Sequence, residues 1–428
     1  MPSAFRAALL APLLLCSTSF PLFEDSSLGV TQIVSSLPET SARYLGSPSL
    51  LPLPNGAWLA SHDWFGAGAG ALIGTTRVLI SRGGGPFSPV GNASGMYWAT
   101  LFSRPGDAAA YLLGTSGDEG GHASIRIARS VDEGATWTSA TLVADARAGF
   151  STGPTPVLLA GGRLWRAFEH NVGAWASGYA AVALSAAADA PDLLAPGAWA
   201  LSGELPFSAV ARDDGGAGIY ILLRVNSAPA ANKAALLALG APGGAPTFKA
   251  WVEPFWGGNS KFSVKRDAAT GLYVTLATWV PEPAAVSLPP SCGPVVLPPG
   301  GAPLPCCGFF EACGAAGGAN GTPAHASCVW CHANSRNRLS LSVARAAGGP
   351  WALAGPPLLL DDTGVPAFVS EMGTGFQYVD WVFSGADIVA SVRAGYRGSN
   401  NCKCGSARAK LRAQRTPQLP TPRRRAKP

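Results

Sequence analysis

Glycine and proline recur along the whole chain and divide it into short segments. There are 53 glycines and 37 prolines among 428 residues, roughly twice the usual share of these two residues. Both destabilise the interior of a helix, so this distribution argues against helix bundles and coiled coils. No apolar run reaches the about 20 residues that a spanning helix needs, and we therefore expect no stable membrane span. The chain is predicted to be all-β.

The apolar segments come in pairs that flank a turn. Residues rich in Val, Ile, Leu, Phe, Tyr and Trp lie on both sides of Gly-, Asn- or Asp-containing stretches, a pattern typical of antiparallel strands. Such hairpins are predicted over Ser49–Ala60, Pro156–Phe168, Ala209–Arg224, Phe262–Trp279 and Phe376–Val392. Repeated over roughly 350 residues, they predict a sandwich array or a β-propeller.

One turn carries a more specific motif. Ser130, Asp132, Gly134, Thr136 and Trp137 match every specified position of S-x-D-x-G-x-T-W, the Asp-box. We expect the Ser and Asp side chains to bond backbone N–H groups across the turn, the Gly to take a positive φ and the Trp to pack under the next strand. A degenerate copy is predicted at Ser81–Phe87. Asp-boxes are structural, so the motif indicates a β-propeller rather than an enzyme.

With this motif, the sequence resembles the sialidase superfamily over roughly residues 40–400, most closely its secreted branch with repeated Asp-boxes. The resemblance implies a six-bladed β-propeller of the sialidase type. In that family three arginines bind the carboxylate of the sugar, an Asp is the acid/base, and a Tyr paired with a Glu is the nucleophile.

Six site residues follow from the resemblance. The implied substrate-binding residues are Arg43, Arg224 and Arg336, and the implied catalytic residues are Asp63, Tyr378 and Glu204. The sequence departs from the family pattern in two places, because the usual Arg-Ile-Pro triplet is absent around Arg43 and Val379 follows Tyr378 where Ser is commoner. Arg338 and Arg345 compete for the position of the third arginine, and further candidates for substrate contact are Glu169, His170, Lys261 and Glu371.

Hairpin geometry supports a common location for most of these residues. Residues equally distant from a turn lie side by side in an antiparallel pair, and a propeller gathers one end of its inner strands around the axis. Arg43, Asp63, Glu204, Arg224 and Tyr378 are all predicted at the end opposite to the nearest turn. We therefore expect them to converge on one mouth of the propeller, with the turns on the other face.

A cysteine-rich insertion is predicted over residues 281–334. Six of the nine cysteines lie in it, namely Cys292, Cys306, Cys307, Cys313, Cys328 and Cys331, and Cys402 and Cys404 follow near the end. Disulfides are favoured, because export through an oxidising compartment is expected. A zinc site that includes Cys328 and Cys331, or a c-type haem on Cys328–His332, are the alternatives.

The two ends of the chain are predicted to lie outside the propeller of residues 21–400. Residues 1–20 have the pattern of a signal peptide, so the protein is expected to be secreted or to reside in the lumen of the secretory pathway. Asn92 and Asn320 fit N-glycosylation acceptors. The tail, residues 401–428, holds nine Lys or Arg residues and no acidic residue, and we expect it to be disordered.

The leading functional hypothesis is an exo-sialidase-like glycosidase that acts on a glycan bearing an acidic sugar. Arginine binds a carboxylate bidentately, and a neutral Tyr nucleophile avoids the repulsion that a carboxylate nucleophile would meet. No cofactor, catalytic metal or nucleic acid is expected. The alternatives are a non-catalytic propeller that binds a glycan or a protein, and a different enzyme of acidic polysaccharides such as an uronic-acid hydrolase or lyase.

Overall fold

The computed structural model describes most of the predicted propeller. The described residues are 32–37, 41, 43–116, 123–144, 149–153, 155–171, 179–204, 209–211, 219–224, 232–257, 262–280, 336–355, 357–360, 374–385, 387–395 and 410–415. The predicted signal peptide and cysteine-rich insertion, all the cysteines, and the candidates Lys261 and Glu371 lie outside these residues. No helix within them is apolar and long enough to cross a membrane.

The described strands form six antiparallel sheets, numbered here in chain order. Sheet 1 contains β2 (Tyr44–Pro52), β3 (Trp58–Phe65), β4 (Thr75–Ser81) and β5 (Ser88–Ser94), and sheet 2 contains β6 (Tyr97–Phe102), β7 (Ala110–Thr115), β8 (Ile125–Ser130) and β9 (Thr138–Val143). Sheet 3 contains β10 (Gly149–Ser151), β11 (Leu158–Ala160), β12 (Arg163–Asn171), β13 (Tyr179–Ala187) and β14 (Trp199–Leu201). Short 3₁₀ helices cover Ala67–Leu72 and Pro196–Ala198.

The second half of the chain repeats this arrangement. Sheet 4 contains β15 (Ala209–Ala211), β16 (Ile219–Arg224), β17 (Ala234–Leu239) and β18 (Thr247–Val252). Sheet 5 contains β19 (Ser263–Arg266), β20 (Tyr273–Thr278), β21 (Arg338–Ala344), β22 (Ala352–Leu353) and β23 (Leu359–Leu360). Sheet 6 contains β24 (Gly375–Ser384), β25 (Asp387–Gly395), β26 (Lys410–Arg415) and β1 (Gln32–Ile33).

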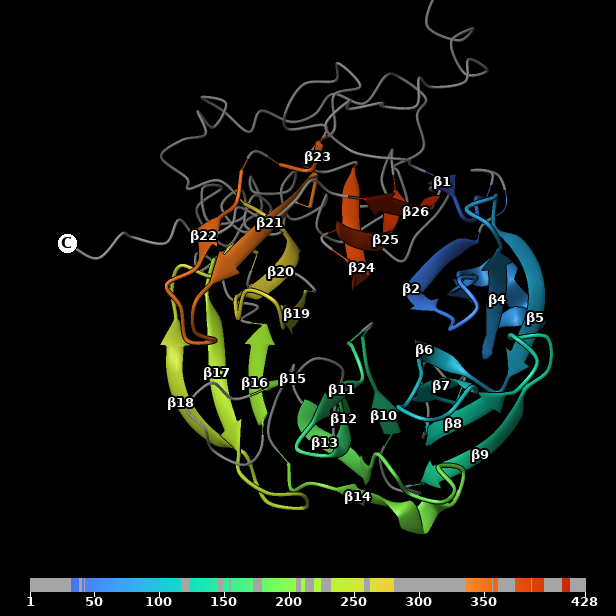
Figure 1. Ribbon diagram of the computed structural model, residues 1–428, viewed down its shortest axis with the longest axis horizontal. Coiled ribbons are helices and arrows are strands. Elements are labelled where there is room, and N and C mark those ends of the chain that lie inside the picture. Colours follow the sequence, from blue (N-terminus) through green and yellow to red (C-terminus); the bar gives the residue numbers. More distant parts are fainter. Residues whose placement is uncertain are drawn as a thin grey trace, which may run out of the picture.

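The sheets surround a common axis, with β2, β6, β10, β15, β19 and β24 nearest to it (Figure 1). The predicted all-β propeller is therefore confirmed, and each of the five predicted hairpins corresponds to a pair of neighbouring strands. Sheet 6 combines strands from both ends of the described chain, because β1 pairs with β26. Residues Lys410–Arg415 belong to the segment predicted as a disordered tail, but here backbone pairing with β25 makes them a strand.

The core lies between neighbouring sheets, which explains the high apolar content of the strands. Leu59 of β3 packs with Val78 and Leu112 between sheets 1 and 2, whereas the next residue, Ala60, packs with Val389 between sheets 1 and 6. Successive residues of a strand point to opposite faces, so a sheet that is covered on both faces needs apolar residues at nearly every position.

The Asp-box turn has the predicted geometry. The backbone N–H of Thr136 donates to Asp132 Oδ1 at 2.9 Å and that of Gly134 donates to Ser130 Oγ at 2.8 Å. Gly134 has φ 90°, and Trp137 packs against the core of sheets 1 and 2. The degenerate copy at 81–87 also connects two paired strands, β4 and β5.

Three inner strands share a distortion that the sequence did not predict. The registers of β2, β6 and β24 shift between Gly46 and Ser49, between Tyr97 and Thr100, and between Gln377 and Asp380. Within these β-bulges, Ser47, Trp98 and Tyr378 have φ values of 49°, 51° and 56°. Left-handed backbone at a residue other than glycine costs about 1–3 kcal/mol and is typical of functional sites.

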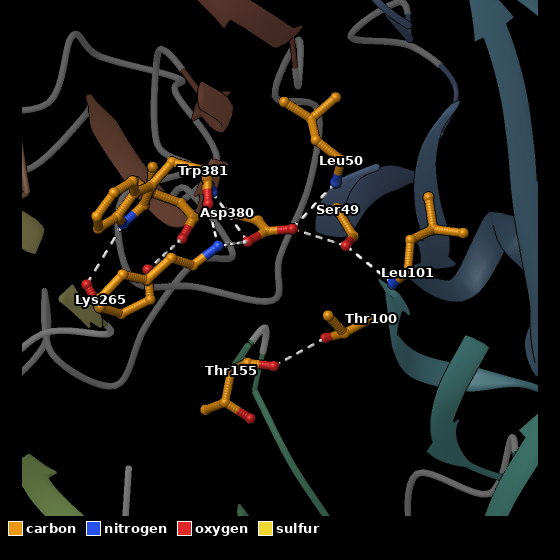
Figure 2. A network of polar contacts seen from close by, with 10 residues as sticks. Ser49, Leu50, Thr100, Leu101, Thr155, Lys265, Asp380 and Trp381 are labelled. Carbon is orange, nitrogen blue, oxygen red and sulfur yellow. Dashed lines mark hydrogen bonds and ion pairs between the residues drawn. The ribbon is translucent and has the colours of Figure 1, made fainter. Parts of the chain in front are cut away.

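Buried polar residues two positions after the left-handed Ser47 and Tyr378 connect the sheets (Figure 2). Asp380 of β24 accepts hydrogen bonds from Ser49 Oγ at 2.7 Å and from the N–H of Leu50 at 3.0 Å. Ser49 Oγ in turn accepts from the N–H of Leu101 on β6. Lys265 of β19 lies 3.3 Å from Asp380 Oδ1. These contacts link sheets 5, 6, 1 and 2 around the axis.

Candidate functional site

A row of aromatic rings lies at the end of the inner strands that carries the bulges, opposite to their hairpin turns. Tyr44 stacks on Phe65 with 5.1 Å between ring centroids, and Phe65 meets Trp98 at 5.0 Å. Trp98 lies 5.8 Å from Tyr378. We call these four residues the aromatic row. It joins sheets 1, 2 and 6, and its Tyr44, Trp98 and Tyr378 are partly exposed.

Asp63 lies directly beneath the aromatic row and is completely buried, with 0% of its surface exposed. Its Oδ1 accepts from Thr76 Oγ1 at 2.5 Å and its Oδ2 accepts from the backbone N–H of Trp98 at 2.7 Å. Burial raises the pKa of Asp63 to about 7, although hydrogen bonds from Thr76, Ser47 and Trp98 oppose the shift. The predicted acid/base residue therefore holds its proton up to about neutral pH, but it has no surface with which to contact a sugar.

Arg166, which the sequence analysis did not single out, lies on β12 and is also 0% exposed. Its Nη2 donates to the carbonyl of Trp98 at 2.8 Å and to that of Gly153 at 3.3 Å. Nε and Nη1 have no hydrogen-bond partner among the described residues. Burial lowers the pKa of Arg166 to about 9, against the attraction of Asp380 and Asp63. The backbone of Trp98 thus donates to the buried carboxyl group of Asp63 and accepts from the buried guanidinium of Arg166.

Tyr378 lies beside a second cation that was not predicted. The Arg393 guanidinium is 4.4 Å from the centroid of the Tyr378 ring. Desolvation lowers the pKa of Arg393, while its interactions with Tyr378 and Tyr44 raise it. Arg336, the predicted third arginine, donates to Gln377 Oε1, and its backbone forms a bridge to Gly375. The structure therefore brings Asp63, Arg336 and Tyr378 to the same end of the inner strands.

Two carboxylates lie in or beside sheet 3, Glu169 in β12 and Glu204 beyond the end of β14. Glu204 is 51% exposed and accepts from His170 Nδ1 at 2.9 Å. Glu169, the residue before His170, accepts from Ser151 Oγ at 2.5 Å. Glu169 and His170 were secondary candidates from the sequence. His170 contacts the predicted Glu204, whereas Glu169 precedes it in β12 and points to the other face of the sheet.

The structure treats the other two predicted arginines differently. Arg43 lies against Trp64, with its Cζ 5.6 Å from the ring centroid. Trp64 follows Asp63 in β3, so the two side chains point to opposite faces of sheet 1, and the expected convergence of Arg43 with Asp63 is not seen. Arg224 ends β16, where its backbone pairs with Ala234, and its side chain lies outside the described part of the structure.

A different sequence signal would have identified the missed residues. Arg166 stands within the apolar strand Leu164–Phe168, and Arg393 stands within Ile388–Ala394. A charged residue in the middle of a buried strand is expensive unless it has partners, so it merits attention as a site candidate. Among the residues that the structure describes, no group of three His, Cys, Asp or Glu side chains is placed to hold a metal ion.

Comparison with known proteins finds similarity of fold. No family model matches the chain, and no curated protein is significantly similar to it. The Penicillium chrysogenum α-L-arabinanase complexed with arabinobiose is 12% identical, with a TM-score of 0.50, over 88% of this chain and 98% of that one. The Fusarium graminearum α-L-arabinofuranosidase Arb93A, solved with an iminosugar inhibitor, is 9% identical, with a TM-score of 0.54, over 91% and 98%.

A sialidase is also among the similar structures. The Hadza microbial sialidase Hz136 is 11% identical, with a TM-score of 0.51, over 89% of this chain and 66% of that chain. Similarity at such low identity concerns the fold and does not transfer an activity. This chain therefore has the β-propeller fold that occurs in a sialidase, an arabinanase and an arabinofuranosidase.

Proposed function

We propose that the protein is a glycoside hydrolase of the sialidase type that removes a terminal acidic sugar from glycans, with Tyr378 as the nucleophile. The observation that carries the proposal is the environment of Tyr378, a partly exposed phenol on a left-handed backbone with a guanidinium 4.4 Å from its ring. The presence of six sheets supports the six-bladed arrangement of that family, and the glycosidases of the same fold support the class of reaction.

The cations around Tyr378 suit an acidic substrate. A sugar acid with its carboxylate on the reacting carbon repels a carboxylate nucleophile, whereas a neutral phenol approaches it without that penalty. Positive charge at this end of sheet 6 comes from Arg393 on β25 and from Arg336, whose backbone forms a bridge to Gly375 at the start of β24. Guanidinium groups bind carboxylates in a planar, bidentate manner. Arg43 and Arg224 remain proposed substrate contacts.

The reaction would proceed in two displacements with retention of configuration. Tyr378 Oη forms a bond to the anomeric carbon while the glycosidic bond breaks, the phenol loses its proton, and the leaving oxygen gains one. Water then cleaves the glycosyl–tyrosine bond, which restores the phenol. Because Asp63 is completely buried, we assign the acid and base steps to Glu204, whose side chain is 51% exposed, and give Asp63 a different role below.

Release of 4-methylumbelliferone from its sialic acid glycoside tests this proposal. Tyr378→Phe removes the nucleophilic oxygen and should lower kcat by about 10³-fold while the fold persists. Tyr111→Phe is the matched control, because Tyr111 lies in sheet 2 and donates to Asp107 at 2.6 Å, away from the aromatic row. A Tyr378→Phe variant that hydrolyses the sialoside like the wild type would refute the role of Tyr378.

The contact between His170 and Glu204 favours a second candidate, a glycosidase of neutral sugars that uses Glu204 as a catalytic carboxylate. Carboxylates are the catalytic groups of most glycosidases, and Glu204 has an exposed side chain with His170 Nδ1 2.9 Å away. The two candidates differ in the variant that inactivates the enzyme. Here Glu204→Gln should abolish hydrolysis of a 4-methylumbelliferyl α-L-arabinofuranoside, and Tyr378→Phe should preserve it. Binding of glycans without any hydrolysis would favour the non-catalytic propeller.

A further inference from the structure

We propose that Trp98 contacts the sugar directly, and that Asp63 and Arg166 are positioning residues which hold the Trp98 backbone in the conformation that presents its indole. The inference rests on the proposed function only in that the ligand is a glycan. It does not depend on which residues perform hydrolysis.

The first argument is the way in which the Trp98 backbone is held. Its N–H donates to Asp63 at 2.7 Å and its carbonyl accepts from Arg166 at 2.8 Å. The two partners come from β3 and β12, so residues of sheets 1 and 3 bind a residue of sheet 2 from both sides. Both partners are completely buried, where hydrogen bonds to ionisable groups are strong and charged groups are costly. Two buried ionisable side chains thus form hydrogen bonds to the backbone of one partly exposed residue.

The second argument is the conformation that these contacts stabilise. Trp98 has φ 51° within the β-bulge of β6. Left-handed backbone is unfavourable for a bulky residue, and it persists only where the surroundings impose it. A Trp whose only contacts are in the core needs no left-handed backbone. Trp381 of β24 is such a residue, with 0% of its surface exposed. The bulge instead leaves the indole partly exposed.

The third argument is the surroundings of the indole. Trp98 meets Phe65 and Tyr97 edge-on, at 5.0 and 5.6 Å between centroids. These contacts fix the ring through its neighbours in sheets 1 and 2. Its tilted contact with Tyr378, at 5.8 Å, places it beside the proposed nucleophile. Aromatic side chains with a few polar groups are the usual lining of ligand sites, and a ring face suits the apolar face of a sugar.

Direct binding measurements test the inference without requiring turnover. In a Tyr378→Phe background, calorimetric titration with 3′-sialyllactose and with arabinobiose gives the reference dissociation constants. For whichever of the two sugars binds, Trp98→Ala should raise the dissociation constant by at least about tenfold. Trp98→Phe should raise it less, because a smaller ring remains. Trp137→Phe is the control, since Trp137 is a partly buried Trp at the opposite end of sheet 2, where its Nε1 donates to Gly134 in the Asp-box turn.

Variants of Asp63 separate positioning from catalysis. Asp63→Asn keeps an oxygen that can accept the Trp98 N–H, whereas Asp63→Leu does not, so the Asn variant should recover most of the affinity lost in the Leu variant. With Tyr378 intact, the Leu variant should raise KM more than it lowers kcat. If Asp63→Asn instead slows turnover by about 100-fold or more at unchanged affinity, Asp63 is the acid/base and the positioning role is overturned. Trp98→Ala keeps the inference testable if Asp63→Leu does not fold.

The outcomes distinguish this inference from the proposed function. Binding that depends on Trp98 in a protein without hydrolytic activity supports the inference and refutes the hydrolase. If the protein hydrolyses the sugar and Trp98→Ala leaves the affinity within about twofold of the reference, the hydrolase is supported and the inference about Trp98 is refuted. If neither sugar binds the reference protein, the inference is overturned.

Discussion

At the residue scale, two neighbours in β3 titrate abnormally in opposite senses. Burial lowers the pKa of His62 from 6.5 to about 3, and burial raises the pKa of Asp63 from 3.8 to about 7. Both side chains are 0% exposed. Each is therefore favoured in its neutral form, and each makes the stability of the fold depend on pH.

The contributions of Asp63 and His62 to the free energy of unfolding depend on pH in opposite directions, and these two dependences should cancel between about pH 4 and pH 6.5. The contribution of Asp63 is complete below the unfolded pKa of 3.8 and is lost as the pH rises through about 7. The contribution of His62 is complete above the unfolded pKa of 6.5 and is lost as the pH falls towards 3. Each changes the free energy of unfolding by about 1.4 kcal/mol per pH unit, with opposite signs.

Single substitutions should reveal the two pH dependences of the free energy of unfolding that cancel in the wild type. Asp63→Asn leaves the His62 term alone, so the free energy of unfolding should rise by about 1.4 kcal/mol per pH unit relative to the wild type over this range. His62→Phe should make it fall by a similar amount. Denaturant unfolding at about pH 4, 5 and 6 measures both slopes. Parallel curves for wild type and Asp63→Asn would show that Asp63 is ionised in the folded protein.

At the element scale, the Asp-box turn is stabilised by its own side chains. Asp132 accepts from the N–H and the hydroxyl of Thr136, at 2.9 and 2.6 Å, and from Ser130 Oγ at 2.8 Å. Such local contacts depend on residues within a few positions, which is why the motif predicted the turn correctly. The β-bulges of β2, β6 and β24 have no comparable signature, since ordinary residues occupy them.

Removal of the Asp132 carboxylate should affect stability and leave sugar binding intact. Asp132→Ala loses all three hydrogen bonds, and we expect a loss of about 1–2 kcal/mol, moderated by exposure of the turn. Asp192→Ala is the control, because Asp192 accepts a single backbone hydrogen bond, from Leu194 at 2.9 Å, and should cost less. Thermal unfolding and titration with sugar measure the two properties. A changed affinity for sugar in Asp132→Ala would contradict the separation of turn and site.

At the scale of the whole molecule, polar contacts between sheets supplement the apolar core. Asp380 connects Lys265 of sheet 5 with Ser49 and Leu50 of sheet 1. Lys265 also donates to the carbonyl of Trp381. Such contacts select one arrangement of neighbouring sheets, because a buried polar group that loses its partner is unfavourable.

Asp380→Ala should therefore destabilise the protein by about 3–5 kcal/mol, since it removes the counter-charge of Lys265 and the acceptor of Ser49 Oγ and of two backbone N–H groups, those of Leu50 and Trp381. Lys265→Met should cost less. A double-mutant cycle should show that the two losses are not additive, because the double variant has no unpaired lysine. Additive losses in denaturant unfolding would mean that the Lys265–Asp380 contact contributes little.

The division between what was predicted and what was missed follows the range of the interactions. Hairpin positions were predicted correctly because strand pairs joined by short turns obey local patterning. The location of Asp63 and Tyr378 at the same end of the inner strands agrees with the hairpin geometry, whereas Arg336 was named by resemblance alone. In contrast, the position of Arg43 on Trp64 was missed, and so was the bond from Arg166 to Trp98. Both depend on which face a side chain occupies, and one extra residue in a β-bulge changes that face.

The amino-acid sequence by itself determined that this protein is all-β and built of antiparallel hairpins, because the frequency of glycine and proline and the alternation of apolar stretches with turns act within a few residues. The Asp-box and the resemblance that it carries then indicated the propeller. Only the tertiary structure decided that Asp63 is buried under Trp98, that Arg166 holds the same residue from another sheet, and that Arg393 lies over Tyr378. The first two contacts join positions 35 and 68 residues apart on different sheets, and closure of the ring of sheets brings them together. The third joins neighbouring strands of one hairpin, where the β-bulge of β24 changes the register.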